Sequence, residues 1–141
     1  MKEMIYSEKS TKEILHSGTY QDHKFVILTL GWHPTAYVEC KLDNCNSVRD
    51  ERLDNIEVHG GFTYLDSAHW DDKDKTLYLG WDYAHFMDFS GIYLKESFPK
   101  VGDYERPIGI KWTTAEIFEE VKSVIEQLKE VERQYDNERC L

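Results

Sequence analysis

Residues 13–30 read EILHSGTYQDHKFVILTL. β-Branched and aromatic residues occur in both halves of this stretch, and the polar tripeptide Gln21-Asp22-His23 separates the halves. The pattern predicts two antiparallel strands joined by a turn, because such residues favour strands and polar residues favour the connection. Residues 35–40, TAYVEC, follow Gly31 and Pro34 and have a similar composition, so we predict a third strand that continues the meander.

Two further strands are predicted between residues 56 and 82. The segments 56–59, IEVH, and 62–65, FTYL, flank the glycine pair Gly60-Gly61. The segment 76–82, TLYLGWD, follows an acidic turn and is rich in strand-forming residues. The predicted sheet therefore has about five strands.

Two regions have no hydrophobic period. Residues 42–55 are polar and turn-prone, which predicts an exposed connection. Residues 83–112 combine glycine, proline and aromatic residues and predict an irregular loop region. Aromatic loops of this kind often form the wall of a pocket.

A long amphipathic helix is predicted at residues 113–135. Thr113-Thr114-Ala115-Glu116 matches a capping box. Apolar residues then recur at intervals of three and four, at Ile117, Phe118, Val121, Val124, Ile125, Leu128, Val131 and Tyr135. A sheet of this width needs only the first turns, so Leu128, Val131 and Tyr135 predict a subunit contact and a homodimer or larger homo-oligomer.

These elements define the predicted fold class, α+β. After an N-terminal extension at residues 1–11, a single domain spans residues 12–141. It contains an antiparallel sheet at 12–82, the irregular loop region at 83–112, and the helix at 113–135 packed on one face of the sheet. The 141 residues, 40% hydrophobic and 13% aromatic, are enough for one core without disulfides.

The charge balance restricts the partners. Asp and Glu total 27 against 17 Lys and Arg, which gives a net charge of -10. Such a chain repels phosphate backbones and anionic lipids, so we expect no DNA or RNA polymer and no membrane as partner. A small anionic ligand is still compatible, because a pocket needs only one or two cationic groups. The N-terminus has no apolar signal segment, and Cys40, Cys45 and Cys140 are an odd number, which favours free thiols in the cytoplasm.

The candidate site lies on two neighbouring segments. One contains His59, Gly60, Gly61 and Thr63, and the other contains Trp81, Asp82, His85 and Asp88. Paired glycines in a strand mark either a bulge or the close approach of a ligand or another backbone. The last three side chains are spaced at three and three, so they share one face of a helical turn.

Several roles are compatible with this spacing. Acids around an imidazole can ligate a divalent metal or act as general acid and base. Alternatively, Asp82 caps a turn and His85 donates to it. The chain lacks HExxH, Walker A, GxGxxG and GxSxG motifs, so no metal, cofactor or catalytic nucleophile is predicted. Surplus aromatic side chains are compatible with stacking on a nucleobase or with building the core and covering the sheet, and Arg106 or Lys111 is a candidate for a phosphate.

Two motifs resemble a family of small proteins encoded by phages and their bacterial hosts. The family has an HGG-[LF]-T-[YF] segment followed by G-[FW]-D-x-A-H-x-x-D. Here they correspond to residues 59–64 and 80–88, within a similarity that covers roughly residues 13 to 130. Trp81 and Tyr83 stand at positions that are often Phe and Cys in the family. The resemblance implies a role in countering host defence.

We therefore predict a protein that binds and sequesters a nucleotide-derived immune signal, such as a cyclic nucleotide or a cyclic ADP-ribose-like molecule. The predicted ligand-binding residues are His59, Gly60, Gly61, Thr63, Trp81, Asp82, His85, Asp88 and Arg106. Two alternatives remain open. One is a phosphodiesterase that cleaves such a signal, and the other is an acidic inhibitor of a host nucleic-acid-binding or defence protein.

Overall fold

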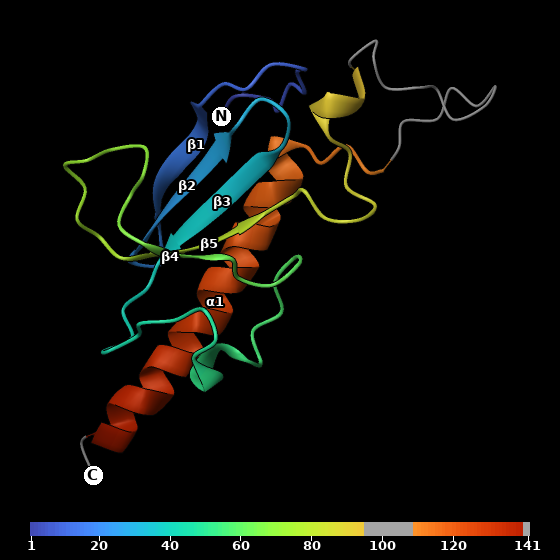
Figure 1. Ribbon diagram of the computed structural model, residues 1–141. Helices are drawn as coiled ribbons and strands as arrows, with labels where there is room; N and C mark the ends of the chain where they lie inside the picture. Colours follow the sequence, from blue (N-terminus) through green and yellow to red (C-terminus); the bar gives the residue numbers. More distant parts are fainter. Residues whose placement is uncertain (95–108, 140–141) are drawn as a thin grey trace.

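The computed structural model describes residues 1–94 and 109–139 and shows an α+β fold (Figure 1). The antiparallel sheet has five strands in the order β1-β2-β3-β5-β4. Helix α1 packs against one face of this sheet. The predicted fold class is confirmed. The elements are β1 (Glu13–Tyr20), β2 (His23–Thr29), β3 (Pro34–Glu39), a short 3-10 helix η1 (Glu51–Leu53), β4 (Tyr64–Asp66), β5 (Tyr78–Asp82), a second 3-10 helix η2 (Gly91–Leu94) and α1 (Thr114–Arg139).

The first hairpin forms as predicted. Its two-residue turn places Gln21 at φ 47° and Asp22 at φ 64°. Positive φ at both central positions is the turn geometry that matches the twist of antiparallel strands. β1 contains a bulge between Ile14 and His16, and β3 continues the meander beside β2.

Helix α1 begins at the predicted capping box. The Thr113 hydroxyl accepts from the backbone N–H of Glu116 at 3.2 Å, and the Glu116 carboxylate accepts from the backbone N–H of Thr113 at 3.1 Å. Both bonds satisfy N–H groups that the first helical turn leaves unpaired. The apolar stripe then packs on the sheet, with five side chains fully buried at Ile117, Val121, Val124, Ile125 and Leu128.

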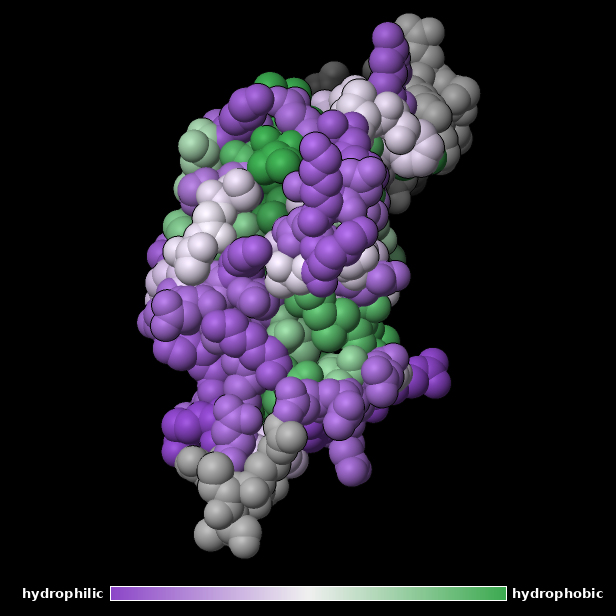
Figure 2. Space-filling view, turned by 90° about the vertical axis from the view of Figure 1, so that its left-hand side faces the viewer, coloured by the Kyte–Doolittle hydropathy of each residue, from purple (hydrophilic) through white to green (hydrophobic). Residues whose placement is uncertain are grey.

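A smaller cluster covers the opposite face of the sheet. Val26, Leu28, Tyr37 and Tyr78 form its buried part, and Trp70 packs on it from the loop that joins β4 and β5. Seen from the side of this loop, most of the surface is hydrophilic, with patches of hydrophobic side chains between (Figure 2). Both faces of the sheet are therefore covered, one by α1 and one by a loop.

The segment 42–55 is not the exposed connection that its composition predicts. Its polar residues are mostly exposed, but Leu42, Cys45 and Leu53 are buried in the main core. The segment packs through η1 against the second half of α1 (Figure 1). This explains why Leu128 is 0% exposed within a single chain.

The predicted subunit contact along the end of the helix is therefore wrong for Leu128. Val131 also packs against the core of its own chain, and Tyr135 lies 5.4 Å from the Arg52 guanidinium. The apolar residues of α1 that extend beyond the sheet therefore contact the connection at residues 42–58 of the same chain.

The predicted strand at 56–59 is also absent, and β4 is only three residues long. Side chains of α1 take the backbone groups of this segment instead. Gln127 bonds the N–H and the C=O of Glu57, and Glu120 accepts from the N–H of His59. Gly60 and Gly61 both have positive φ, which is not a strand conformation, and the chain joins the sheet only after them.

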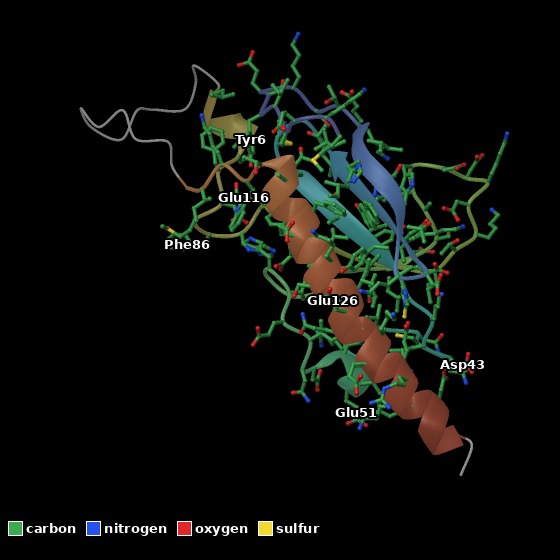
Figure 3. The ribbon with its side chains drawn as sticks, turned by 180° about the vertical axis from the view of Figure 1, so that it is seen from behind. Tyr6, Asp43, Glu51, Phe86, Glu116 and Glu126 are labelled. Atoms are coloured by element: carbon green, nitrogen blue, oxygen red, sulfur yellow. The ribbon has the colours of Figure 1, made fainter. Side chains whose placement is uncertain are left out.

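Residues 1–11 are tied to the domain. The backbone N–H groups of Lys2 and Ser7 donate to Leu15 and Gly31, and the Tyr6 hydroxyl donates to the carbonyl of Trp112. Figure 3 shows Tyr6 beside the first turns of α1. The N-terminal segment therefore fixes the end of the helix that lies nearest the candidate site.

The thiols of Cys40 and Cys45 are free, as predicted, and both are buried. Burial raises the pKa of Cys40 to about 12, which keeps it protonated and unreactive. Cys140 lies outside the described residues. Among the helices of the described chain, none combines the length and the apolar character that a membrane crossing requires.

Candidate functional site

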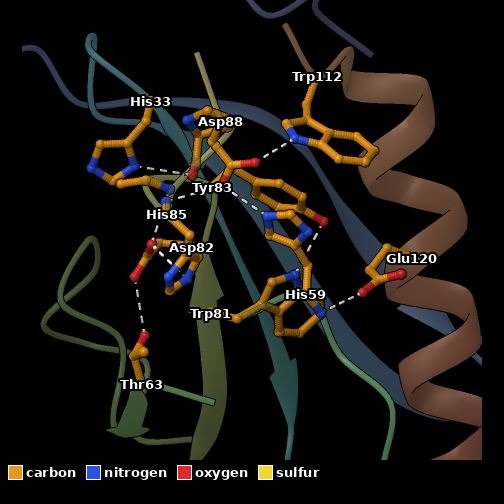
Figure 4. Close-up of polar contacts among 12 residues, drawn as sticks. His33, His59, Thr63, Trp81, Asp82, Tyr83, His85, Asp88, Trp112 and Glu120 are labelled. Atoms are coloured by element: carbon orange, nitrogen blue, oxygen red, sulfur yellow. Dashed lines mark hydrogen bonds and ion pairs between the residues drawn. The ribbon is translucent and has the colours of Figure 1, made fainter. Parts of the chain in front are cut away.

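The candidate site lies where β5 ends, between the turn that follows it and the first turns of α1 (Figure 4). Residues 82–88 form one side of the site, and the glycine turn at 59–61 forms another side. The two segments that the sequence singles out are thus brought together. Trp112 and Glu120 join them from the helix side.

Asp88 is the buried centre of this site. Its side chain is 2% exposed. It accepts three hydrogen bonds: from Nε2 of His59 at 2.8 Å, from the backbone N–H of His85 at 3.0 Å and from Nε1 of Trp112 at 2.8 Å. A carboxylate with this many donors is fully satisfied and holds its partners in place. Asp88 therefore orients the site and does not itself face a ligand.

His59 is fixed on three sides. Its ring stacks on Tyr83 with the centroids 4.5 Å apart, and it meets the edge of Trp112 at 5.1 Å. Its backbone N–H donates to Glu120 at 2.7 Å. Because Asp88 accepts at Nε2, that nitrogen carries the proton, and none of the described residues bonds Nδ1. His59 is thus a rigid imidazole with one nitrogen available.

Asp82 and His85 form a looser pair. Asp82 Oδ1 lies 3.2 Å from His85 Nε2, and the side chains are 26% and 35% exposed. The contact is an ion pair without the alignment of a hydrogen bond, and Nε2 is a buried atom that has no hydrogen-bond partner among the described residues. Asp82 instead accepts from the backbone N–H of Ala84 at 3.1 Å and from the Thr63 hydroxyl at 3.3 Å. Asp82 therefore does cap a turn, while the bond from His85 is not made.

The two glycines of the motif have different roles. A Cβ on Gly60 would lie 2.1 Å from Nε2 of His85, whereas a Cβ on Gly61 would meet nothing within 4 Å. Both residues have positive φ, 70° and 80°. The close approach that the motif suggests is therefore real at Gly60, but the approaching group is the protein's own His85.

The remaining predicted residues lie elsewhere. Trp81 is 1% exposed in the core, where its indole N–H donates to the Tyr83 hydroxyl at 3.1 Å. Burial raises the pKa of Tyr83, which keeps the phenol neutral. Arg106 lies outside the described residues. Lys111 places its ammonium 4.7 Å from the Phe89 ring and so has another partner.

The sequence analysis does not identify Trp112 and Glu120, which support the site, or the exposed ring of Phe86. Trp112 and Glu120 reach the site from the start of α1, and nothing in their local pattern indicates it. Phe86 lies between His85 and Asp88 in the sequence and is 94% exposed. Figure 3 shows its ring pointing away from the body of the protein. Its position inside the motif is the one feature that could have marked it.

Within the described residues, no group of three or more His, Cys, Asp or Glu side chains is placed to hold a metal ion. Comparisons with protein families, with curated proteins and with solved structures found no match. The likeness to the phage and bacterial family therefore rests on the two motifs alone.

Proposed function

We propose that this protein binds and sequesters a small nucleotide-derived ligand at Asp82 and His85. One observation carries the proposal: these two side chains are partly exposed, and their ion pair at 3.2 Å leaves Nε2 of His85, a buried atom at the base of the site, without a hydrogen bond. They stand on a frame in which Asp88 is buried and fully bonded. Polar groups with free bonding capacity on a rigid support are typical of binding sites.

The site offers the chemistry that a nucleotide needs. Asp82 accepts from a ribose or base N–H or O–H. His85, whose Nε2 is buried beside Gly60, donates to a phosphate or base through Nδ1. Phe86 presents an exposed ring beside them, and stacking of one base on an aromatic ring contributes about 1–3 kcal/mol. The phage and bacterial resemblance supports the further proposal that the ligand is an immune signal of bacterial anti-phage defence.

A second candidate function, phosphodiester cleavage, is favoured by the His59–Asp88 pair. A buried carboxylate on one imidazole nitrogen leaves the other nitrogen as a base, which is the arrangement used in general base catalysis. In this alternative, Nδ1 of His59 takes a proton from the water that attacks phosphorus, the P–O bond to the leaving ribose oxygen breaks, and the imidazolium returns the proton to that oxygen. General acid–base catalysis of this kind contributes about 10²–10⁴-fold in rate.

One experiment separates the candidates. The protein is incubated with a panel of cyclic oligonucleotides and cyclic ADP-ribose isomers, the free ligand is quantified, and the protein is then heat-denatured. Chromatography of the supernatant shows intact ligand for a binder and converted ligand for an enzyme. No depletion of any nucleotide would contradict both and would favour an acidic inhibitor of a host protein.

Matched variants connect the result to the site. Asp82→Ala and His85→Ala should abolish depletion, whereas Asp72→Ala, which changes an exposed acid in the β4–β5 loop, should not. His59→Asn separates capture from cleavage, because it removes the base and should stop conversion only. If Asp82→Ala depletes the ligand as well as the wild type, the site is misassigned.

A further inference from the structure

The outer edge of β1 is open along its second half. β1 is the terminal strand of the sheet, and Figure 3 shows it in dark blue at the outer edge of the sheet. The first half is protected by the bulge at residues 14–16 and by Lys2, whose backbone N–H donates to the carbonyl of Leu15 at 2.7 Å. Bulges and covering segments are the usual protection of a strand edge. Among the residues that the structure describes, nothing of either kind protects residues 17–19, and all three are exposed.

The register of the hairpin shows which backbone groups face outward. Tyr20 and His23 close the two-residue turn and form a hydrogen-bonded pair. Because such pairs alternate with non-bonded pairs, Thr19 and Ser17 direct their N–H and C=O groups away from β2. The N–H of Lys24, which is opposite Thr19, donates to Glu39 on the other side, as this alternation requires.

Gly18 lies between these two residues, and the fold of one chain does not require a glycine there. Its φ is not in the left-handed region. A Cβ at this position would touch only the ring of Phe25, at an ordinary 3.5 Å. A glycine within a strand weakens it, and it often marks the close approach of another backbone.

We propose that a second copy of this chain pairs antiparallel with β1 about a two-fold axis at Gly18. Ser17 of each copy then exchanges two hydrogen bonds with Thr19 of the other, and the two Gly18 residues face each other in a non-bonded pair. The five-stranded sheet of each chain becomes half of a continuous sheet. The interface is isologous, as closed dimers require.

Charge and packing favour a second copy as the occupant. The chain has a net charge of -10, yet residues 14–20 contain no Asp, Glu, Lys or Arg. Two copies can therefore meet here without like charges in the paired strands. On the helix side, the His16 ring contacts Phe118 at a centroid distance of 4.8 Å, and both are half-buried. In this register, Tyr20 of the second copy is opposite His16 and covers this ring pair.

The first test is the mass of the native protein by sedimentation equilibrium at micromolar concentration. We expect two chains for the wild type and one chain for Thr19→Pro, which removes the outward N–H and leaves the β1–β2 ladder intact. Thr19→Val keeps the N–H and should remain dimeric. Circular dichroism confirms that each variant is folded. A monomeric wild type, or a folded Thr19→Pro dimer, would overturn the proposal.

Cross-linking tests the register without weakening the strand. In a Cys140→Ser background, Gly18→Cys should form an intermolecular disulfide under mild oxidation. Non-bonded pairs place their Cα atoms about 4.5 Å apart, within the disulfide range of roughly 4.4–6.8 Å. Lys24→Cys is exposed on the same hairpin but away from the axis, and it should cross-link poorly. Equal yields from the two positions would refute a two-fold axis at Gly18.

Discussion

Two histidine–carboxylate pairs lie at opposite ends of α1, and they differ in how completely they are bonded. At the far end, His23 Nε2 lies 2.6 Å from Glu132, and Nδ1 lies 2.9 Å from the carbonyl of Gln21. Glu132 also accepts from the backbone N–H of Lys41 at 2.7 Å. The two side chains are 4% and 9% exposed. Both imidazole nitrogens face acceptors, so the charged imidazolium fits this position.

In the His59–Asp88 pair near the candidate site, the carboxylate is also buried, but the imidazole ring is partly exposed. Asp88 is 2% exposed and His59 is 24% exposed, and only one of the two ring nitrogens is bonded by the described residues. A saturated pair holds elements together, whereas an unsaturated pair has bonding capacity left for a ligand. The comparison therefore supports the proposal that the His59–Asp88 end binds a ligand while the His23–Glu132 pair serves stability.

The largest expected loss of unfolding free energy follows from breaking the fully bonded His23–Glu132 pair. Glu132→Ala leaves a buried imidazolium without its counter-ion, which typically destabilises a protein by about 3–5 kcal/mol. The control is Glu126→Ala, which changes an exposed acid of the same helix that accepts from the Tyr20 hydroxyl. Urea denaturation should show a large loss of unfolding free energy for the first variant and little change for the second. Equal small losses would remove the distinction between the two ends.

The next effect is expected at Asp88. Asp88→Asn keeps the volume but leaves one carbonyl oxygen for the three donors that the carboxylate accepts. An unpaired buried donor costs about 1–3 kcal/mol. Urea denaturation should show this loss, and ligand depletion should fall because the 82–88 turn, which carries Asp82 and His85, is no longer held. Asp82→Asn is the matched control for stability, and a similar loss in both variants would contradict the buried role of Asp88.

The two glycines of the site give a sharper comparison. Gly60→Ala and Gly61→Ala both place a side chain at positive φ, which costs roughly 1–2 kcal/mol. Only the first also meets His85, where its Cβ would lie 2.1 Å from Nε2. Thermal melts should therefore show a loss for both, larger for Gly60→Ala, and ligand capture should fail only in Gly60→Ala. A Gly61→Ala variant that loses capture while Gly60→Ala keeps it would reverse the assignment.

The hairpin and the helix could be predicted because their determinants are local. The polar turn at 21–23 separates two strand-forming runs, and the capping box at 113–116 precedes a regular apolar period. The segment 56–59 has strand-forming composition, but Glu120 and Gln127 take its backbone groups from 61 and 70 residues away. No local sequence pattern indicates that distant side chains of α1 take these backbone groups in place of a neighbouring strand.

The sequence predicted that His59, Asp82, His85 and Asp88 lie close together, but it did not predict how they are bonded. Spacing brought Asp82, His85 and Asp88 together, but it treated all three as equivalent. Asp88 is set apart by bonds to His59 and Trp112, which lie 29 and 24 residues away. Likewise, the apolar residues of the 42–55 connection are too sparse to show a period, although Leu53 covers the helix.

The pH dependence of stability should follow the titration of His23 in the His23–Glu132 pair. Desolvation lowers the pKa of His23, but the hydrogen bonds to Glu132 and Gln21 outweigh it, and the pKa is raised from 6.5. The stability from this pair is therefore fully present below pH 6.5 and is lost as the pH rises through the folded-state pKa. Melting temperatures measured upward from pH 6 should fall, and Glu132→Gln should flatten this part of the profile. An identical profile in Glu132→Gln would exclude His23 as its source.

The smallest effect on stability is expected where the effect on function is largest. Asp82 and His85 are partly solvated in the free protein, and their mutual contact is not a formed hydrogen bond. Asp82→Ala loses the hydrogen bonds from Ala84 and Thr63 and the partly exposed ion pair with His85. A neutral bond at a partly exposed group contributes about 0.5–1.5 kcal/mol, and water replaces part of it.

Both Asp82→Ala and His85→Ala should therefore melt close to the wild type and yet fail to deplete the nucleotide ligand. Truncating His85 also removes the ring that packs against Gly60. The double variant His85→Ala/Gly60→Ala should therefore tolerate the new Cβ better than Gly60→Ala alone, which a thermal melt can measure. A pair that serves only the fold would give the opposite result, a large loss of thermal stability with ligand capture retained. That result would show that Asp82 and His85 belong with His23 and Glu132, at the structural end of the comparison.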